Sequence, residues 1–334
     1  MDKVNALLLL AWIVGCSAMS SEFLEDEWKM WKNKYEKNYA TLEEETHRRE
    51  NWEATRKKVL EHNQLADQGK KKFRLTMNHF ADMSSEDRNS RNCLLPIESR
   101  KTKARSYRRK TSLNIPDEVD WRKEKCVTPV RNQGAYCGSC WAFATVAVLE
   151  SRYCIKYKEL IKLSEQQLLD CDRVDEACCG GLPRNAFRYI SDHGIMKRNE
   201  YEYEERANAC QYEKNEILKM NISKYYVLPD EENMAMSVAF DGPVTVAIGS
   251  HEEFQLFDGK GIYDGECTEK VNHAIVIVGY GTEEGTDYWI IRNSWGESWA
   301  DGGYAKVPRN VNKCLIGEEA ATADILGPKE VPNW

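Results

Sequence analysis

The stretch Cys137-Gly138-Ser139-Cys140-Trp141-Ala142-Phe143 places a thiol directly before an apolar run that continues to Leu149. An apolar run of this length predicts a buried helix. Cys140 would stand at the N-terminus of that helix, where unpaired N–H groups and the positive end of the helix dipole favour the thiolate. Because the thiolate is the reactive form of cysteine, the stretch predicts a nucleophile at Cys140.

Two short segments near the far end of the chain carry the side chains that a nucleophilic cysteine needs. Val271-Asn272-His273-Ala274 contains an imidazole, and Arg292-Asn293-Ser294-Trp295-Gly296 contains a side-chain amide. We expect His273 to act as base and acid, and the amide oxygen of Asn293 to orient its ring toward the thiol. Trp295 would cover this hydrogen bond, and it can pack in the core at the same time.

These motifs occur together with others in an order that resembles papain-like cysteine proteases of the cathepsin L type. Four more segments follow the family's order: residues 115–122, 131–134, 163–171 and 178–181. The family's His and Asn lie about 130–150 residues after its Cys, and here the separations are 133 and 153 residues. The resemblance implies an α+β, two-lobed papain-like fold, with a helical N-terminal lobe and a β-barrel-like C-terminal lobe on either side of the active-site cleft.

Local sequence patterns agree with this division. Helices are expected over residues 141–157, 164–170 and 184–193, with Ser164 and Gln167 forming a capping box. Strands are expected over residues 244–248, 274–279, 288–293 and 304–307. Cys140 would therefore lie on the helical lobe, and His273 and Asn293 on the β lobe.

By the same resemblance, the side chain of Gln133 would donate to the oxyanion beside the backbone N–H of Cys140. The segment Gln133-Gly134-Ala135-Tyr136-Cys137 has one more residue between Gln and Cys than the family pattern. The extra residue would either bulge outward and leave Gln133 in place, or pull the donor out of register. Loops absorb insertions at little cost, which favours the bulge.

The resemblance also implies which residues contact a substrate. Backbone groups of Gly180 and Gly181 would pair with the substrate main chain. Trp295 is also expected to contact the substrate. The pocket for the P2 side chain would be lined by Leu182, Pro183, Ala247, Val271 and Ala274. Glu319 either lies at the base of this pocket, where it would accept Arg as well as apolar side chains, or is an ordinary surface charge. Cys179, if free, would put a second thiol at the rim of the cleft.

Two segments are expected before the peptidase domain of residues 113–334. Residues 1–18 resemble a secretory signal peptide, with a basic residue, a short apolar run and a small-residue cleavage site. Residues 19–112 resemble an inhibitory, helical propeptide, in which residues 22–63 have helical spacing and Asn78 to Asp82 form a second motif. Acidic side chains of the propeptide are expected to pair with the peptidase domain, so that low pH releases it. The basic linker of residues 100–112 is the expected cleavage region.

Twelve cysteines in a chain that enters an oxidising compartment predict disulfides. The resemblance implies the pairs Cys137–Cys178, Cys171–Cys210 and Cys267–Cys314, with Cys140 free. The pattern leaves Cys93, Cys126, Cys154 and Cys179 unassigned, and Cys179 could compete with its neighbour for Cys137. Cys137 and Cys140 also form a CxxC pair, but the βαβ pattern of a redox site is missing.

Charge and composition exclude some classes of function. A net charge of −7 argues against a nucleic-acid partner, and no later apolar run is long enough to span a membrane. We expect a cysteine endopeptidase made as a zymogen, without metal or cofactor, monomeric, and located in the lysosome or outside the cell. Expected partners are protein and peptide substrates, its own propeptide and cystatin-type inhibitors.

Two alternatives remain. A catalytically weak or inactive protease-like binding protein is favoured by the extra residue near Gln133 and by Cys179. An exopeptidase would need an insertion that blocks the cleft, and none is evident. The sequon Asn221-Ile222-Ser223 would carry a glycan or remain an unused surface Asn.

Overall fold

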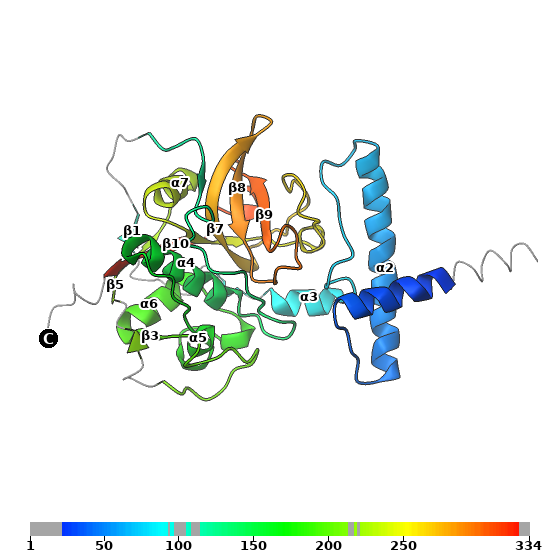
Figure 1. Cartoon of the computed structure of the whole chain (residues 1–334), viewed down its shortest axis with the longest axis horizontal. Helices are drawn as coiled ribbons and strands as arrows, with labels where there is room; N and C mark the ends of the chain where they lie inside the picture. Colours follow the sequence, from blue (N-terminus) through cyan, green and yellow to red (C-terminus); the bar gives the residue numbers. More distant parts are fainter. Residues whose placement is uncertain are drawn as a thin grey trace, which may run out of the picture.

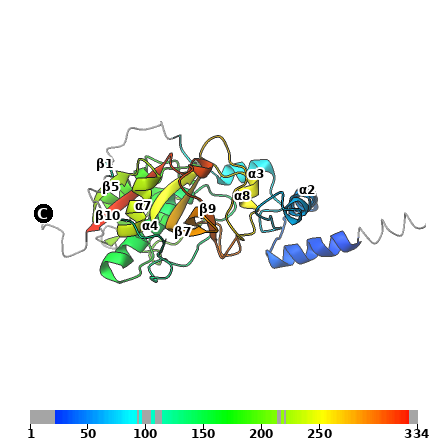
Figure 2. The ribbon, with the colours of Figure 1, turned by 90° about the horizontal axis from the view of Figure 1, so that it is seen from above.

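The computed structural model describes residues 22–92, 94–96, 105–107, 114–212, 217–218 and 221–326. The peptidase part has two lobes that meet along helix α4 (Figure 1). The propeptide helices lie to one side of it, and α3 extends from them toward the peptidase body (Figures 1 and 2). The α+β architecture and the helical propeptide agree with the expectation from the sequence.

The helical lobe is built around α4 (Cys140–Tyr157), nearly all of whose side chains are buried. It packs against α5 (Glu165–Cys171) and α6 (Pro183–His193), and the short strands β3 (Ile195–Met196) and β4 (Ile217–Leu218) form a small hairpin-like sheet beside them. Pro183 begins α6 at a position where its missing N–H costs nothing. Ser164 caps α5 by accepting from the N–H of Gln167, but the Gln167 side chain bonds elsewhere, so the capping box is only half formed.

The β lobe is a mainly antiparallel sheet, in the order β1-β5-β10-β6-β7-β8-β9, with β2 also paired to β7. Its strands are β1 (Arg105–Ser106), β2 (Val119–Asp120), β5 (Asn221–Val227), β6 (Val244–Ile248), β7 (His273–Glu283), β8 (Thr286–Arg292), β9 (Tyr304–Pro308) and β10 (Ala320–Leu326). The helices α7 (Glu231–Phe240) and α8 (Glu252–Gln255) and the single turn η3 (Lys313–Leu315) belong to this half of the chain. The single turn η2 (Ala177–Cys179) lies between α5 and α6. The loop from β8 to β9 carries Asn293 and Trp295.

The propeptide forms two long helices rather than one continuous helix over residues 22–63. Residues 22–34 are helical, the chain then turns, and α2 (Leu42–Asp67) begins after Thr41, whose side chain caps it. Trp52 of α2 holds the two helices together: its ring packs edge-on against Trp28 and at a tilt against Trp31, and these two rings stack on each other. A third helix, α3 (Ser85–Arg91), begins with a complete capping box between Ser84 and Asp87. Helix α3 is short and polar, so its sequence carries no apolar periodicity from which it could be predicted.

Two of the backbone pairings between the propeptide and the peptidase domain involve the β lobe. Leu75 pairs with Phe257 as an isolated bridge, next to a hydrogen bond from Thr76 N–H to Leu256 O of 2.8 Å. Strand β1 pairs in parallel with β5 at the edge of the main sheet. Residues 105–107 of the expected cleavage linker are therefore bound to the sheet, while residues 97–104 and 108–113 lie outside the described residues.

Candidate active site

Cys140 begins helix α4, as its sequence context predicted, and is completely buried in this propeptide-bound state. The N–H of Ala274, the second residue of β7, lies 3.4 Å from Cys140 Sγ. The thiol therefore lies between the first turn of α4 and the start of β7. Cys137 is bonded to Cys178 rather than to Cys140, so these two cysteines do not form a redox pair.

His273 begins β7, directly beside the thiol. Its Nε2 donates to Asn293 Oδ1 at 2.8 Å, and this amide oxygen also accepts from the N–H of Ser294. The indole of Trp295 stacks on the imidazole with ring centroids 4.4 Å apart, and His273, Asn293 and Trp295 are all buried. Trp295 thus both packs in the core and shields the hydrogen bond, and its indole lies against the histidine ring.

Burial and, to a smaller extent, the nearby Arg91 guanidinium lower the pKa of His273 to about 3, and the Asn293 hydrogen bond only partly opposes them. Arg91 is the last residue of propeptide helix α3 and is itself buried. The imidazole is therefore neutral while the propeptide is bound. Its other ring nitrogen, Nδ1, is buried without a hydrogen-bond partner among the described residues.

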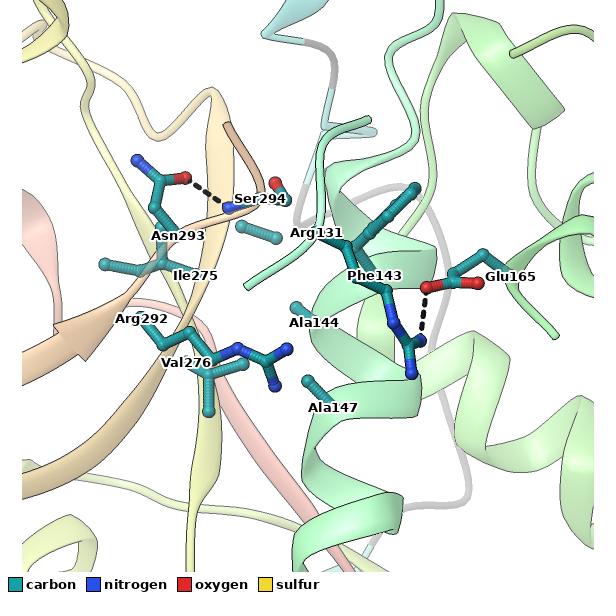
Figure 3. Close-up of a pocket in the computed structure, with 11 residues that line it drawn as sticks. Arg131, Phe143, Ala144, Ala147, Glu165, Ile275, Val276, Arg292, Asn293 and Ser294 are labelled. Carbon is teal, nitrogen blue, oxygen red and sulfur yellow. Dashed lines mark hydrogen bonds and ion pairs between the residues drawn. The ribbon is translucent and has the colours of Figure 1, made fainter. Parts of the chain in front are cut away.

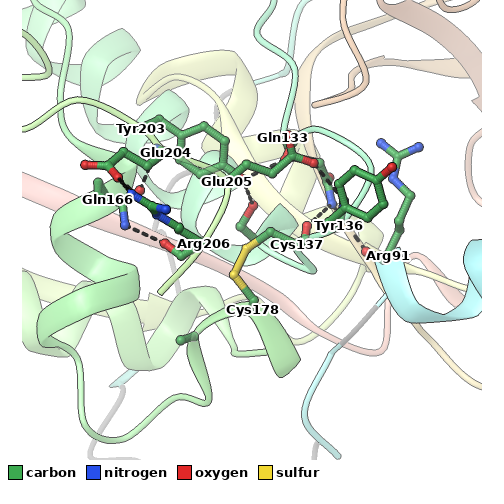
Figure 4. Close-up of a disulfide and its surroundings, with 12 residues drawn as sticks. Arg91, Gln133, Tyr136, Cys137, Gln166, Cys178, Tyr203, Glu204, Glu205 and Arg206 are labelled. Atoms are coloured by element: carbon green, nitrogen blue, oxygen red, sulfur yellow. Dashed lines mark hydrogen bonds and ion pairs between the residues drawn. A yellow bond between two sulfur atoms is a disulfide. The ribbon is translucent and has the colours of Figure 1, made fainter. Parts of the chain in front are cut away.

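Gln133 remains beside these residues despite the extra residue in its loop. Its Oε1 accepts from Ser294 Oγ at 2.7 Å, and its backbone N–H donates to Ser294 O. Its Nε2 donates to Cys137 O at 3.1 Å and to Arg91 O of the propeptide at 3.3 Å. Tyr136 is 82% exposed, so the loop bulges outward, as favoured above (Figure 4). This removes one of the two observations that favoured an inactive protein.

The propeptide passes through the region in which a substrate would lie. Leu94 forms a parallel bridge with Gly181, and the Arg91 carbonyl occupies the donor of Gln133. A Cβ placed on Gly181 would come within 2.4 Å of the Trp141 indole, so glycine is required there by packing as well as by access. The propeptide therefore contacts both the oxyanion-donor candidate Gln133 and the glycine pair that was expected to bind a substrate main chain.

The residues expected to line the P2 pocket lie on both lobes, and an ion pair between Arg184 and Glu319 connects the two groups. Ala247 pairs with Ala274 across β6 and β7, and its N–H donates to Glu319 O at 2.8 Å. Leu182 and Pro183 open helix α6, and the next residue, Arg184, forms a 3.0 Å ion pair with Glu319. Val271 is half-buried, just before β7. Glu319 is only 3% exposed, so it is not an ordinary surface charge.

A buried ion network behind the catalytic residues was not found from the sequence. Arg131, two residues before Gln133, binds Glu150 of α4 and Glu165 of α5 at 2.6 Å each. Together with α4, β7 and the end of β8 with the residues that follow it, Arg131 encloses a cavity of about 10 Å³ between the lobes (Figure 3). No local motif predicts this network, because its members come from three separate segments of the sequence.

The structure contains the three expected disulfides and a fourth, Cys126–Cys154. Cys179 is free and exposed, and it does not displace Cys178. Cys93 lies outside the described residues, as does the signal peptide. Asn221 is the first residue of β5, but its side chain is also outside the described part.

The acidic groups that bind the propeptide belong to the peptidase domain, contrary to expectation. Glu252 of α8 pairs with Lys58 and Arg88, and the neighbouring Glu253 pairs with His62 and Lys71. Two acids of the propeptide pair within it instead: Asp82 with Lys37, and Asp87 with Arg48. The charge complementarity is therefore the reverse of the one we expected.

Residues 115–323 match the papain family cysteine protease. The chain belongs to this family. Residues 28–87 of the protease match the cathepsin propeptide inhibitor domain. The protease is thus a papain-like cysteine endopeptidase of the cathepsin L type, made as a zymogen whose own propeptide is its inhibitor.

Named relatives cover almost the whole protease. Cathepsin L of Sarcophaga peregrina is 40% identical over 321 residues, which are 91% of this chain and 94% of that protein. Cathepsin S of Bos taurus is 39% identical over 311 residues, 90% of this chain and 93% of that protein. A digestive procathepsin L from the larval midgut of Tenebrio molitor superimposes with a TM-score of 0.83 at 34% identity, covering 90% of this chain and 99% of that one.

None of the helices in the described residues of the protease is both long and apolar enough to cross a membrane.

Proposed function

We propose that Cys140 is the nucleophile of this endopeptidase, His273 its general base and acid, and Asn293 the residue that orients the imidazole. One observation carries the proposal. The residue after His273 donates to the Cys140 thiol, while His273 itself donates to Asn293. Thiol, imidazole and amide are therefore assembled in one buried place by α4, β7 and the loop after β8.

In this mechanism the Cys140 thiolate forms a C–S bond to the peptide carbonyl carbon, and the carbonyl electron pair moves onto oxygen. The C–N bond then breaks as the His273 imidazolium donates its proton to the leaving amine. Water, deprotonated by His273, attacks the acyl-enzyme and releases the acid and the thiolate. The side chain of Gln133 and the backbone N–H of Cys140 stabilise the oxyanion. The hydrogen bond from Gln133 Nε2 to the Arg91 carbonyl supports this role, because it shows that the Gln133 amide is available to donate to an oxygen outside the peptidase domain.

For substrates, we propose that Gly180 and Gly181 pair with the main chain and that the P2 pocket prefers apolar side chains. Leu182, Pro183, Ala247, Val271 and Ala274 supply its apolar walls. Glu319 would attract an Arg side chain only if its charge were unmatched, and Arg184 already neutralises it at 3.0 Å. We therefore propose that the protease accepts Arg at P2 less well than it would if the Glu319 carboxylate had no cation beside it.

We further propose that residues 1–18 direct the chain into the secretory pathway, and that the protease acts in the lysosome or outside the cell. Four disulfides within the described residues support passage through an oxidising compartment. Cystatin-type inhibitors are proposed partners, and the mature protease is proposed to be a monomer.

The test is hydrolysis of a fluorogenic Phe-Arg dipeptide by acid-activated protein, beside a Cys140→Ala variant processed in trans. We expect turnover in the first and none in the second. A thiol-trapping epoxide should label Cys140 in mature protein. Turnover by correctly processed Cys140→Ala would overturn the assignment of the nucleophile. Labelling without turnover would contradict the proposed oxyanion site instead.

A further inference from the structure

The loop that contains the extra residue, residues 133–139, forms hydrogen bonds with residues 203–205 of the helical lobe. The Tyr203 hydroxyl donates to Gln133 O at 2.6 Å and lies 2.8 Å from Ser139 Oγ. Gln133 and Ser139 are the two ends of the loop, and Ser139 directly precedes Cys140. One hydroxyl therefore joins the oxyanion-donor end of the loop to its nucleophile end.

Glu205 contacts the middle of the same loop, where the extra residue lies. Its Oε1 accepts from the backbone N–H of Tyr136 at 2.7 Å. The carboxylate also lies directly against Gly134: a Cβ added there would be 1.8 Å from the carboxyl carbon of Glu205. Gly134 has φ +83°, a conformation that favours glycine. The loop backbone thus curves around this carboxylate.

Glu205 itself has a left-handed backbone, with φ +57°. For a residue with a Cβ this conformation is strained, so it persists where surrounding contacts hold it. The Glu205 side chain contacts Gly134 and Tyr136. The strained residue and the bulged loop therefore stabilise each other.

We propose that Glu205 is a positioning residue, which holds the lengthened loop in its outward bulge and so keeps Gln133 in register for the oxyanion. Ser294 fixes the Gln133 side chain from the β lobe, and Tyr203 fixes its backbone from the helical lobe. Without Glu205 the extra residue is free to relax along the loop toward Gln133. This inference rests on the proposed role of Gln133 as the oxyanion donor.

The experiment compares mature, active-site-titrated variants, because Glu205 also interacts electrostatically with Arg91 of the propeptide. Glu205→Ala should lower kcat by roughly 10- to 100-fold with little change in KM, because a misplacement of about 1 Å can cost about 10²-fold. Glu205→Gln, which keeps an acceptor for the Tyr136 N–H, should retain most of the activity. Glu204→Ala is the matched control, since that carboxylate pairs with Arg206.

Two double variants separate positioning from general damage. In a Gln133→Ala background, Glu205→Ala should cause no further loss of kcat, because the donor it positions is gone. Deleting Tyr136 should make Glu205→Ala silent, because no extra residue then needs to be held. Equal, multiplicative losses in the wild-type and Gln133→Ala backgrounds would overturn the proposal, as would full activity of Glu205→Ala. An unchanged kcat in Gln133→Ala alone would instead refute the oxyanion role of Gln133.

Discussion

At the scale of single residues, His273 has a different environment in the zymogen from the one it needs for catalysis. Burial and the Arg91 guanidinium hold its pKa at about 3, so it is neutral. When the propeptide leaves, Arg91 leaves with it and solvent reaches the ring. Both changes raise the pKa of His273, which then becomes able to form an imidazolium beside the Cys140 thiolate.

Asn293→Ala tests the orientation of that ring. Without the 2.8 Å hydrogen bond the imidazole can turn away from the thiol. We expect kcat of the mature protease to fall about 10²-fold, as for other small misplacements of catalytic groups, while KM changes much less. Asn199→Ala, at an exposed position, is the control. A wild-type kcat for Asn293→Ala would show that Trp295 and packing alone orient His273.

Arg184→Met tests the paired acid of the P2 pocket. The change frees the Glu319 carboxylate, and a hydrogen bond to a charged group is worth about 1.5–3 kcal/mol. We expect the ratio of kcat/KM for Arg-Arg over Phe-Arg dipeptides to rise about tenfold or more. The gain should disappear in Arg184→Met/Glu319→Ala, which also removes the buried unpaired charge. An unchanged ratio in soluble Arg184→Met would place Glu319 outside the pocket.

At the scale of elements, α8 is the pH-sensitive contact with the propeptide. Burial alone would raise the pKa of Glu253, but the Glu266 N–H, Lys71 and His62 outweigh it and hold the pKa below its usual value. A carboxyl with a depressed pKa stabilises the complex at neutral pH, and that contribution is lost as the pH falls through the depressed pKa.

Glu252→Gln/Glu253→Gln should therefore mimic acid. We expect the double variant to release its propeptide at a pH where the wild type remains a zymogen, as followed by gel and by turnover of Phe-Arg. Glu266→Gln is the control, because only the backbone of Glu266 binds Glu253. Identical pH profiles for wild type and double variant would contradict this role of α8.

The loop after α5 should make the protease more stable in acid. Burial and the neighbouring Asp172 raise the pKa of Asp175 to about 8, and burial also raises that of Asp172. A carboxyl with a raised pKa stabilises the fold fully in acid and loses that contribution as the pH rises toward the raised value. The Asp175 oxygen that accepts from the Leu182 N–H also ties this loop to the P2 pocket.

Asp175→Asn keeps that oxygen and removes the titration. We expect its Tm to exceed that of the wild type by a few degrees at pH 7.5, since about 1 kcal/mol shifts Tm by ~2–4 °C in a domain of this size. At pH 3.5, below the ordinary pKa of an aspartate, the two Tm values should agree. Asp192→Asn, at an exposed site, is the control. A Tm difference that does not depend on pH would refute the raised pKa as its cause.

At the scale of the whole molecule, the sequence predicted what is encoded locally. The apolar run after Cys140 predicted α4, and the contexts of His273 and Asn293 placed them on the β lobe. Contacts between distant segments could not be predicted this way. Arg184 and Glu319 are 135 residues apart, and the propeptide cations meet the acids of α8 across nearly 200 residues. Such pairs leave no periodic pattern, and the same is true of the Arg131 network.

The insertion near Gln133 shows the same limit in one loop. The sequence shows that the loop has one extra residue. Whether that residue bulges outward or shifts Gln133 depends on Glu205, about 70 residues away. Similarly, the sign of the charges between propeptide and peptidase domain could not be inferred from composition, since both parts contain acids and bases. Only the docked structure distinguishes internal ion pairs from those that cross the interface.

Removal of the propeptide should uncover a site that is already assembled around Cys140. The most direct measurement is a time course after acidification of the zymogen, which follows propeptide cleavage, epoxide labelling of Cys140 and Phe-Arg turnover together. We predict that labelling and turnover rise in step with propeptide loss, and that both are absent in Cys140→Ala. Full loss of the propeptide without labelling or turnover, in correctly processed protein, would contradict the account.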